Sequence, residues 1–236
     1  DFDGDGFDDL AVGIQGQDAG GVNGAGGVHV IFGSASGLSR RDRVITRATR
    51  GVAGAPGQDG FGSVVAAGDF DGDGFDDLAV GAPFDAVGGV LNAGSVHVLY
   101  GSRRGPSGKR DRILAHGRPG LGPAGGPFEG FGWTLAVANL AGDRRDDLAV
   151  TTINGPAGGV DDAGYVEVLP GGPRGLTGRG RTRLSRASAG VAGDPVSFEA
   201  FGYSLAAGEM GGSRRVDLAI GARRAQVDAA TDAGSV

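Results

Sequence analysis

The sequence contains no cysteine, a single lysine and a single methionine, and no long apolar run. Without cysteine the chain can form neither a disulfide framework nor a thiolate metal site or nucleophile. No apolar stretch approaches the ~18 residues of a membrane-spanning helix, so we expect no membrane insertion. Acidic residues outnumber basic ones, giving a net charge of −6 and a pI near 5.0. This balance argues against a nucleic-acid partner held by phosphate neutralisation.

Glycine is the most conspicuous residue that is present. The 236 residues include 51 glycines and 10 prolines, a content that is typical of low-complexity chains when it has no period. Collagen needs glycine at every third position, and no such run occurs. Hydrophobic residues make up 39% of the chain, which is enough to bury a core, so we looked for a longer repeat.

Three independent markers recur with one period of about 70 residues. A Phe-Gly pair recurs at a spacing of 70, an acidic segment at spacings of 68, 70 and 70, and a Gly-x-Val triplet keeps the same register. The markers begin at Phe61, Phe131 and Phe201; at Asp1, Asp69, Asn139 and Glu209; and at Gly26, Gly94, Gly164 and Gly234. A repeat of this length indicates a solenoid, a propeller or another array.

Each period contains four short apolar segments, which we predict to be strands. In one repeat they are residues 63–68, 78–81, 95–100 and 111–115, each bounded by Gly, Pro or Asp. No segment has a sustained helical period. Four strands per long repeat predict an all-β propeller. The expected units are a partial blade 1–60, blades 61–130 and 131–200, and a partial blade 201–236. Together they form an open segment of about 3.4 blades from a larger ring.

The acidic segment predicts a calcium loop in two of the repeats. Alternate side-chain oxygens point towards one centre, glycine permits the sharp turn, and the carbonyl at the seventh position adds a ligand, as in an EF-hand. Valine replaces the EF-hand glutamate at the twelfth position, and strands flank the loop, so this is a different calcium site. The alternative is a solvated acidic turn. The predicted ligands are Asp1, Asp3, Asp5, Phe7 and Asp9, and Asp69, Asp71, Asp73, Phe75 and Asp77.

The same loop has lost ligands in the other two repeats, where we expect no metal. The remaining positions are Asn139, Asp143 and Asp147, and Glu209, Ser213 and Asp217. Both degenerate loops gain an arginine pair, Arg144-Arg145 and Arg214-Arg215. We expect a guanidinium to replace the cation there, and the last aspartate of each loop to hold the following strand. About two Ca²⁺ ions are therefore expected in all.

The residues Phe61-Gly62, the 69–77 loop and Gly81-Ala82-Pro83 together resemble the FG-GAP repeat of integrin α-subunit propellers. This resemblance covers essentially the whole chain; Thr151-Thr152 departs from it where Gly-Ala is expected. It implies a seven-bladed extracellular propeller with calcium loops on one face and partner binding on the opposite face. The absence of cysteine favours a bacterial secreted relative over an animal integrin.

The histidines do not suggest an enzyme. His29 and His97 occupy equivalent positions in the third strand, where Glu167 stands in the next repeat, which indicates a structural role. His116 is expected to be a surface imidazole. There is no Gly-x-Ser-x-Gly nucleophile motif. The phenylalanines of the Phe-Gly pairs are expected in the core, whereas Trp133 varies between repeats and is a candidate for ligand contact.

We therefore predict a non-catalytic, calcium-stabilised module for cell adhesion or protein–protein binding, located outside the cell or at its surface. Two alternatives remain: a lectin-like propeller that binds a glycan, and an accessory propeller of a secreted hydrolase or phospholipase. The expected partners are a protein or glycan ligand and the remaining blades of the same chain, without nucleic acid and without membrane insertion.

Overall fold

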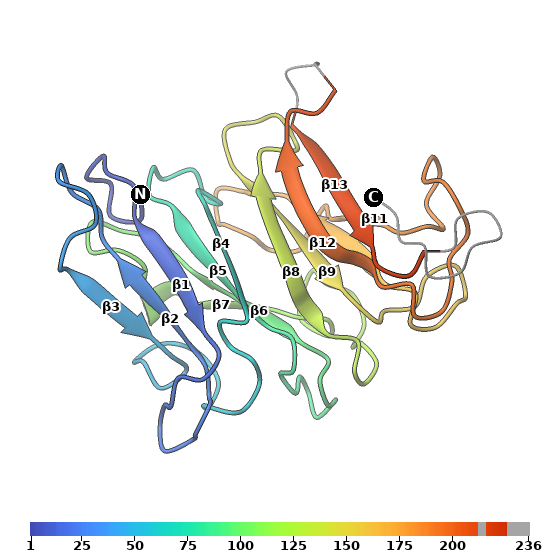
Figure 1. Ribbon diagram of the computed structural model, residues 1–236, viewed down its shortest axis with the longest axis horizontal. Helices are drawn as coiled ribbons and strands as arrows, with labels where there is room; N and C mark the ends of the chain where they lie inside the picture. Colours follow the sequence, from blue (N-terminus) through green and yellow to red (C-terminus); the bar gives the residue numbers. More distant parts are fainter. Residues whose placement is uncertain (212–215, 226–236) are drawn as a thin grey trace.

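The computed structural model describes residues 1–211 and 216–225, and within them the chain is all-β (Figure 1). One turn of 3-10 helix, η1 (Gly108–Arg110), interrupts a connection. Among the described residues, no helix is both long and apolar enough to cross a membrane. The strands are β1 (Leu10–Ile14), β2 (Gly27–Ile31), β3 (Asp42–Ile45), β4 (Val64–Gly68), β5 (Asp77–Ala82), β6 (Ser95–Leu99), β7 (Arg112–Leu114), β8 (Phe131–Ala138), β9 (Asp147–Thr152), β10 (Tyr165–Leu169), β11 (Thr182–Leu184), β12 (Phe201–Gly208) and β13 (Asp217–Ala222).

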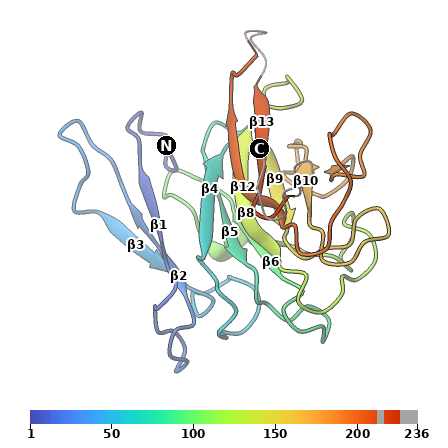
Figure 2. The same ribbon diagram turned by 45° about the vertical axis from the view of Figure 1, so that its right-hand side comes forward.

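The strands form four antiparallel sheets in chain order. Their strand orders are β1-β2-β3, β4-β5-β6-β7, β8-β9-β10-β11 and β12-β13. The four strands predicted for one repeat correspond to β4–β7, with ends that differ by at most one residue. The sheets follow one another like a fan, with β1–β3 at one end and β12–β13 at the other (Figures 1 and 2). This arrangement confirms an open part of a β-propeller.

The hydrophobic core lies between successive sheets rather than within one of them. One cluster joins Val28 of β2 to Leu78 and Val80 of β5, and the next joins Val96 of β6 to Leu148 of β9. The phenylalanines of the three Phe-Gly pairs lie in these clusters and are 0% to 4% exposed. Because short strands alternate their side chains between two faces, each sheet contributes to the core on both sides.

Two of the sequence markers touch each other across every boundary between sheets. The N–H of Phe131 donates to the carbonyl of Ala93 at 2.9 Å, beside Gly94. A Cβ on Gly94 would lie 2.2 Å from the carbonyl oxygen of Phe131. The same approach occurs between Gly26 and Phe61 and between Gly164 and Phe201. The glycine is therefore required because the backbones of neighbouring blades meet there.

An ion pair is repeated in the segment that leads from the fourth strand of one sheet to the next sheet. Arg47 pairs with Asp59, Arg186 pairs with Glu199 at 2.5 Å, and His116 occupies the equivalent position between them. The expectation of a surface imidazole is therefore wrong: His116 is 6% exposed and lies 2.9 Å from a carboxylate oxygen of Glu167. A single sequence does not show that a histidine replaces an arginine in a repeated ion pair.

The histidines of the third strand have the structural role predicted for them. His97 is fully buried on β6, and its Nδ1 lies 3.0 Å from Oδ2 of Asp111. His29 lies 2.6 Å from Oδ2 of Asp42 on the neighbouring strand β3.

Candidate functional site

The two complete acidic loops have the same hydrogen-bonded shape. In the loop between β4 and β5, the carboxylate of Asp69 accepts the N–H groups of Gly72, Asp73 and Gly74 at 2.7, 3.1 and 3.0 Å. The carboxylate of Asp1 accepts the equivalent N–H groups of residues 4, 5 and 6 at 2.7, 3.2 and 2.8 Å. The first aspartate of each loop thus folds the chain around itself, as Asp does in an Asx turn.

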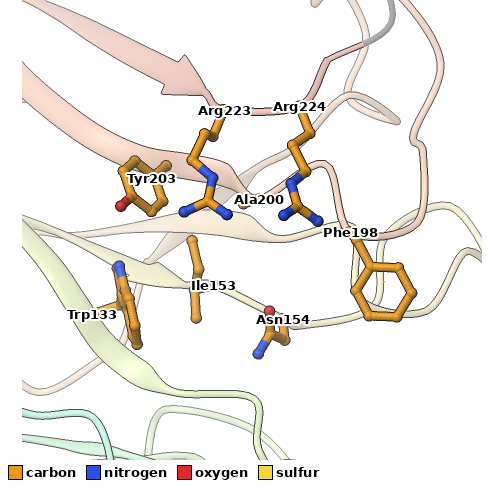
Figure 3. Close-up of a pocket in the computed structure, with 8 residues that line it drawn as sticks. All are labelled: Trp133, Ile153, Asn154, Phe198, Ala200, Tyr203, Arg223 and Arg224. Atoms are coloured by element: carbon orange, nitrogen blue, oxygen red, sulfur yellow. The ribbon is translucent and has the colours of Figure 1, made fainter. Parts of the chain in front are cut away.

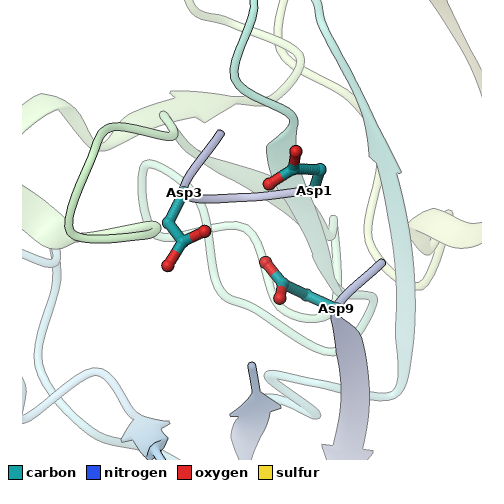
Figure 4. A group of neighbouring side chains, drawn as sticks. All are labelled: Asp1, Asp3 and Asp9. Carbon is teal, nitrogen blue, oxygen red and sulfur yellow. The ribbon is translucent and has the colours of Figure 1, made fainter. Parts of the chain in front are cut away.

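Carboxylates converge in both loops, although the two sets differ. Oxygens of Asp1, Asp3 and Asp9 lie within 4.8 Å of one another (Figure 4), as do oxygens of Asp69, Asp71 and Asp73. The predicted ligands outside these groups are Asp5 and Phe7, both exposed, Phe75, half-buried, and Asp77, buried. Three converging carboxylates form an oxygen-rich site of the kind that Ca²⁺ prefers.

The third position of each loop carries a buried oxygen without a partner. The side chains of Asp3 and Asp71 are 3% and 5% exposed. In each, Oδ1 has no hydrogen-bond partner, while Oδ2 pairs with an arginine. An unpaired carboxylate oxygen removed from water is costly. A cation bound by the loop would satisfy it, so the residues present fit a metal ion.

The electrostatic environment of the 69–77 loop also favours a cation. Burial, reinforced by the negative charges of Asp71 and Asp73, raises the pKa of Asp77 to about 8. Burial also raises the pKa of Asp73, with further contributions from the charges of Asp71 and Asp69. Carboxylates that oppose each other's ionisation in this way gain most from a shared positive ion.

An arginine approaches each complete loop from the connection between the third and fourth strands. Arg110 lies 2.6 Å from Asp71 and 3.7 Å from Asp73, and its guanidinium carbon lies 4.6 Å from the ring centre of Tyr100. Arg41 contacts Asp3 in the same way and stacks on Phe32 at 3.8 Å. Where Ala141 replaces the third-position aspartate, Pro170 replaces the aromatic residue. Sequence analysis did not identify these arginines, because they lie about 40 residues from the loops.

The last aspartate of each loop has a structural function. Asp77 accepts the N–H of Phe70 at 3.1 Å and that of Gly101 at 2.9 Å. It thereby ties the loop to the end of β6. Asp9 makes the equivalent bonds to residues 2 and 33. Asp147 accepts the N–H groups of residues 141 and 171, and Asp217 accepts those of residues 210 and 211. This explains why the residue is present in loops that have lost other ligands.

The degenerate loops follow the predicted pattern in part. Asn139 Oδ1 accepts the N–H of Gly142 at 2.7 Å, as Asp69 does in its own loop. Arg145 pairs with Asp143 at 2.5 Å, so one of the two remaining carboxylates there has a guanidinium partner. Glu209 is exposed at the end of β12. Ser213 and the pair Arg214-Arg215 lie outside the described residues.

Neighbouring acidic loops are linked to each other. The N–H of Asp146 donates to the carbonyl of Asp69, and the N–H of Asp69 donates to the carboxylate of Asp146, at 3.0 and 3.1 Å. The N–H of Asp76 donates to the carbonyl of Asp1 at 3.0 Å, and the backbone nitrogen of Asp1 lies 2.7 Å from Oδ2 of Asp76. The same pair of bonds therefore joins the first loop to the second and the second loop to the third.

A second feature lies at the opposite ends of the strands. A cavity of about 200 Å³ opens between the first strands of the third and fourth sheets, β8 and β12 (Figure 3). Its lining includes Trp133, Phe198, Tyr203, Arg223 and Arg224. The Arg223 guanidinium lies 4.9 Å from the ring centre of Tyr203. Trp133, the ligand-contact candidate from the sequence, therefore lies in a cavity with further aromatic and cationic side chains.

Comparison with known proteins agrees with this architecture. A family model described as FG-GAP repeat matches residues 1–31 and 61–99. The chain is 34% identical over 206 residues to phosphatidylinositol-glycan-specific phospholipase D of Rattus norvegicus and 32% identical to the Homo sapiens protein of the same name. It is also 33% identical over 168 residues to integrin alpha-PS2 of Drosophila melanogaster.

These matches cover most of this chain and a small part of each relative. The phospholipase D matches cover 87% of this chain and 23% of the relative, and the integrin match covers 69% and 11%. The chain thus spans about a quarter of the length of the phospholipase D relatives. The repeat markers, the sheet order and these comparisons together identify the chain as an FG-GAP repeat β-propeller of the integrin α-subunit type.

Proposed function

We propose that this chain is a calcium-stabilised, non-catalytic part of an extracellular propeller that binds a protein partner. The unpartnered buried oxygens of Asp3 and Asp71 carry the calcium assignment, since each lies among converging carboxylates. Asp1, Asp3, Asp5, the Phe7 carbonyl and Asp9 would hold one ion. Asp69, Asp71, Asp73, the Phe75 carbonyl and Asp77 would hold the other. Ca²⁺ would supply positive charge and oxygen coordination; it takes part in no reaction here.

Calcium would act on the fold through the links between loops. Each complete loop is bonded to its own third strand through Asp9 or Asp77 and to the next loop through backbone groups. An ion that fixes one loop therefore also stiffens its neighbour. Loops without the twelfth-position glutamate are expected to bind weakly, in the ~10⁻⁴–10⁻³ M range of extracellular modules. That affinity suits a location where calcium is abundant.

Isothermal titration of the full-length protein tests the metal assignment. We expect Asp71→Asn and Asp3→Asn each to remove one calcium ion from the stoichiometry and Asp143→Asn, in a degenerate loop, to remove none. The double variant should remove two. Unchanged stoichiometry in D71N and D3N would show that the loops are acidic turns.

The partner surface is proposed for the face opposite the acidic loops. Trp, Tyr and Arg are enriched among residues that dominate protein interfaces, and the cavity between β8 and β12 holds all three. Trp133→Ala and Arg223→Ala should weaken adhesion or partner capture by the full-length protein without changing its calcium stoichiometry. Exposed Leu91→Ala, in the loop between β5 and β6, is the control on the same face.

An accessory role beside a hydrolase is a second candidate, favoured by the match to phospholipase D along 87% of the chain. In that case the catalytic residues lie in another part of the protein. Hydrolysis of a phosphatidylinositol-glycan substrate by the full-length protein, retained when His97 and His116 are each replaced by glutamine, would support it. Absence of hydrolysis would leave the adhesion proposal.

A further inference from the structure

Positive charge is concentrated in three short segments of this acidic protein. The connections between the third and fourth strands are residues 32–41, 100–111 and 170–181. Together they hold nine of the 22 basic residues and one acidic residue, Asp111. They carry a net charge of +8 while the whole chain carries −6, so the other residues carry −14. A segregated field of this kind, rather than the net charge, determines what a surface attracts.

Most of these cations have no protein partner. Arg41, Arg110 and Arg181 pair with carboxylates. The remaining six, here called the basic band, are exposed and form no ion pair or side-chain hydrogen bond with any residue of the described ranges. They are Arg40, Arg103, Arg104, Lys109, Arg174 and Arg179.

Four residues of the basic band line two hollows on successive blades. Arg103 and Arg104 line one of about 420 Å³ together with Arg110, and Asp73 and Phe75 of the acidic loop also line it. Arg174 and Arg179 line one of about 270 Å³ together with Arg112. Three guanidiniums around each hollow offer forked donors that match the oxygens of a sulfate or carboxylate group.

The connections that carry the band are held in place and joined from blade to blade. Tight turns close them, with the N–H of Gly105 donating to Ser102 and that of Gly175 to Gly172, each at 2.6 Å. Arg43 of β3 donates to the carbonyl of Pro106 in the next connection at 2.6 Å, and Arg112 of β7 donates to that of Leu176 at 2.9 Å. The hollows are therefore fixed neighbours along one rim of the fan.

The form of the band favours one class of anion. Among the described residues of the three connections, Leu38 is the one large apolar side chain that is exposed, and a single leucine gives little apolar surface to insert into a lipid layer. Tyr100 is buried beneath Arg110. The half-buried Phe75 is the one aromatic ring among the residues that line the two hollows, whereas a single-strand nucleic-acid groove stacks successive bases on several rings. Cations that recur from blade to blade match an anion with regularly spaced charges.

We propose that the basic band binds a linear sulfated polysaccharide laid across successive blades. The band lies at the strand ends that carry the acidic loops, away from the cavity at Trp133. The larger hollow borders the proposed calcium loop through Asp73 and Phe75. None of the six cations is a ligand of either site, so the inference rests on neither the proposed calcium binding nor the proposed partner binding.

Affinity for a heparin octasaccharide, measured by titration of the full-length protein at two salt concentrations, tests the proposal. The variant R103Q/R104Q/R174Q/R179Q should bind at least about tenfold more weakly, a loss of about 1.4 kcal/mol, and with a smaller salt dependence. The matched control is R223Q/R224Q, which removes two exposed arginines from the Trp133 cavity at the opposite strand ends. It should bind like the wild type.

Three outcomes would overturn the proposal: no heparin binding by the wild type, equal weakening in the band variant and the control, or tighter binding to phosphatidylserine vesicles or duplex DNA than to heparin. Circular dichroism and the melting temperature establish that the variants are folded. R103Q/R104Q alone, which leaves Arg110 as the one cation of its hollow, should give an intermediate loss; no loss in this variant would contradict binding across both blades.

Discussion

His116 and Glu167 form a buried pair across the boundary between the second and third sheets, with 2.9 Å between Nε2 and Oε2. The side chain of Glu167 is fully buried, and that of His116 is 4% exposed. Arg181 and Arg183 contact the other carboxylate oxygen at 2.8 and 3.2 Å. This single carboxylate therefore joins β10 and β11 to the end of the preceding blade.

The pH dependence of stability should reflect this pair. Burial alone would raise the pKa of Glu167, but His116, Arg181 and Arg183 lower it from 4.5 to about 2. A carboxyl whose pKa is lowered by folding stabilises the fold above its unfolded value and loses that effect as the pH falls towards 2, here about 3 kcal/mol. About 2 kcal/mol of this effect is lost by pH 3, and Glu167→Gln should remove that part of the difference in unfolding free energy between pH 7 and pH 3. Exposed Asp161→Asn should leave the difference intact, and an equal effect of the two changes would refute the assignment.

The sequence allowed the fold to be predicted because its markers are periodic. Strand positions for β4–β7 follow from short apolar runs between Gly, Pro and Asp, and the propeller follows from their repetition. The contacts between the markers of neighbouring blades could not be predicted from this repetition. That Gly94 meets Phe131 depends on how one blade lies against the next, which no local pattern specifies. His116 was expected at the surface but is buried, and the prediction failed for the same reason.

Only those parts of the candidate site that are formed by residues close together in the sequence could be predicted. The hydrogen-bonded turn of residues 69–74 follows from the spacing of Asp and Gly. The arginine that reaches Asp71 comes from residue 110, and the partner of its equivalent, Arg41, is residue 3. Such pairs depend on a connection folding back over the loop. The basic band was hidden for another reason, because the net charge of −6 averages over segments of opposite sign.

Replacement of Gly94 by alanine should separate two blades. Its φ of +85° disfavours an L side chain, and the added Cβ would lie 2.2 Å from the Phe131 carbonyl. The strain of φ and the overpacking together should cost about 3 kcal/mol or more. Gly89 has φ +86° with open space around it, so Gly89→Ala should cost about 1–2 kcal/mol. Chemical denaturation measures the unfolding free energy of both variants. Similar losses would mean that the close approach of Gly94 to Phe131 adds no cost of its own.

The loss of stability caused by replacing Asp147 should not depend on calcium, whereas the loss caused by replacing Asp71 should depend on it. Asp147 accepts N–H groups from residues 141 and 171 at 2.7 and 2.9 Å in a loop that has lost metal ligands. Asp147→Ala should therefore destabilise the protein by about 2–4 kcal/mol with or without calcium. Asp71→Asn should lower the melting temperature only in the presence of calcium. Melting curves recorded with Ca²⁺ and with a chelator make the comparison, and a calcium-dependent effect of D147A would contradict its purely structural role.

Arg110 should compete with calcium for the 69–77 loop. Its guanidinium contacts Asp71 and lies near Asp73, two of the three converging carboxylates, and an ion entering the loop must share or displace it. Hydrogen bonding to Asp71 raises the pKa of Arg110, so the side chain stays charged wherever calcium binding is measured. The removal of this half-exposed cation should change the free energy of calcium binding by up to about 1 kcal/mol. Arg110→Gln should therefore tighten calcium binding about three- to fivefold, as measured by titration calorimetry, and Arg41→Gln should do the same for the first loop. Arg104→Gln removes a neighbouring cation that touches no loop carboxylate and should change the affinity least. Weaker calcium binding in R110Q would show instead that the arginine holds Asp71 in the geometry that the ion requires.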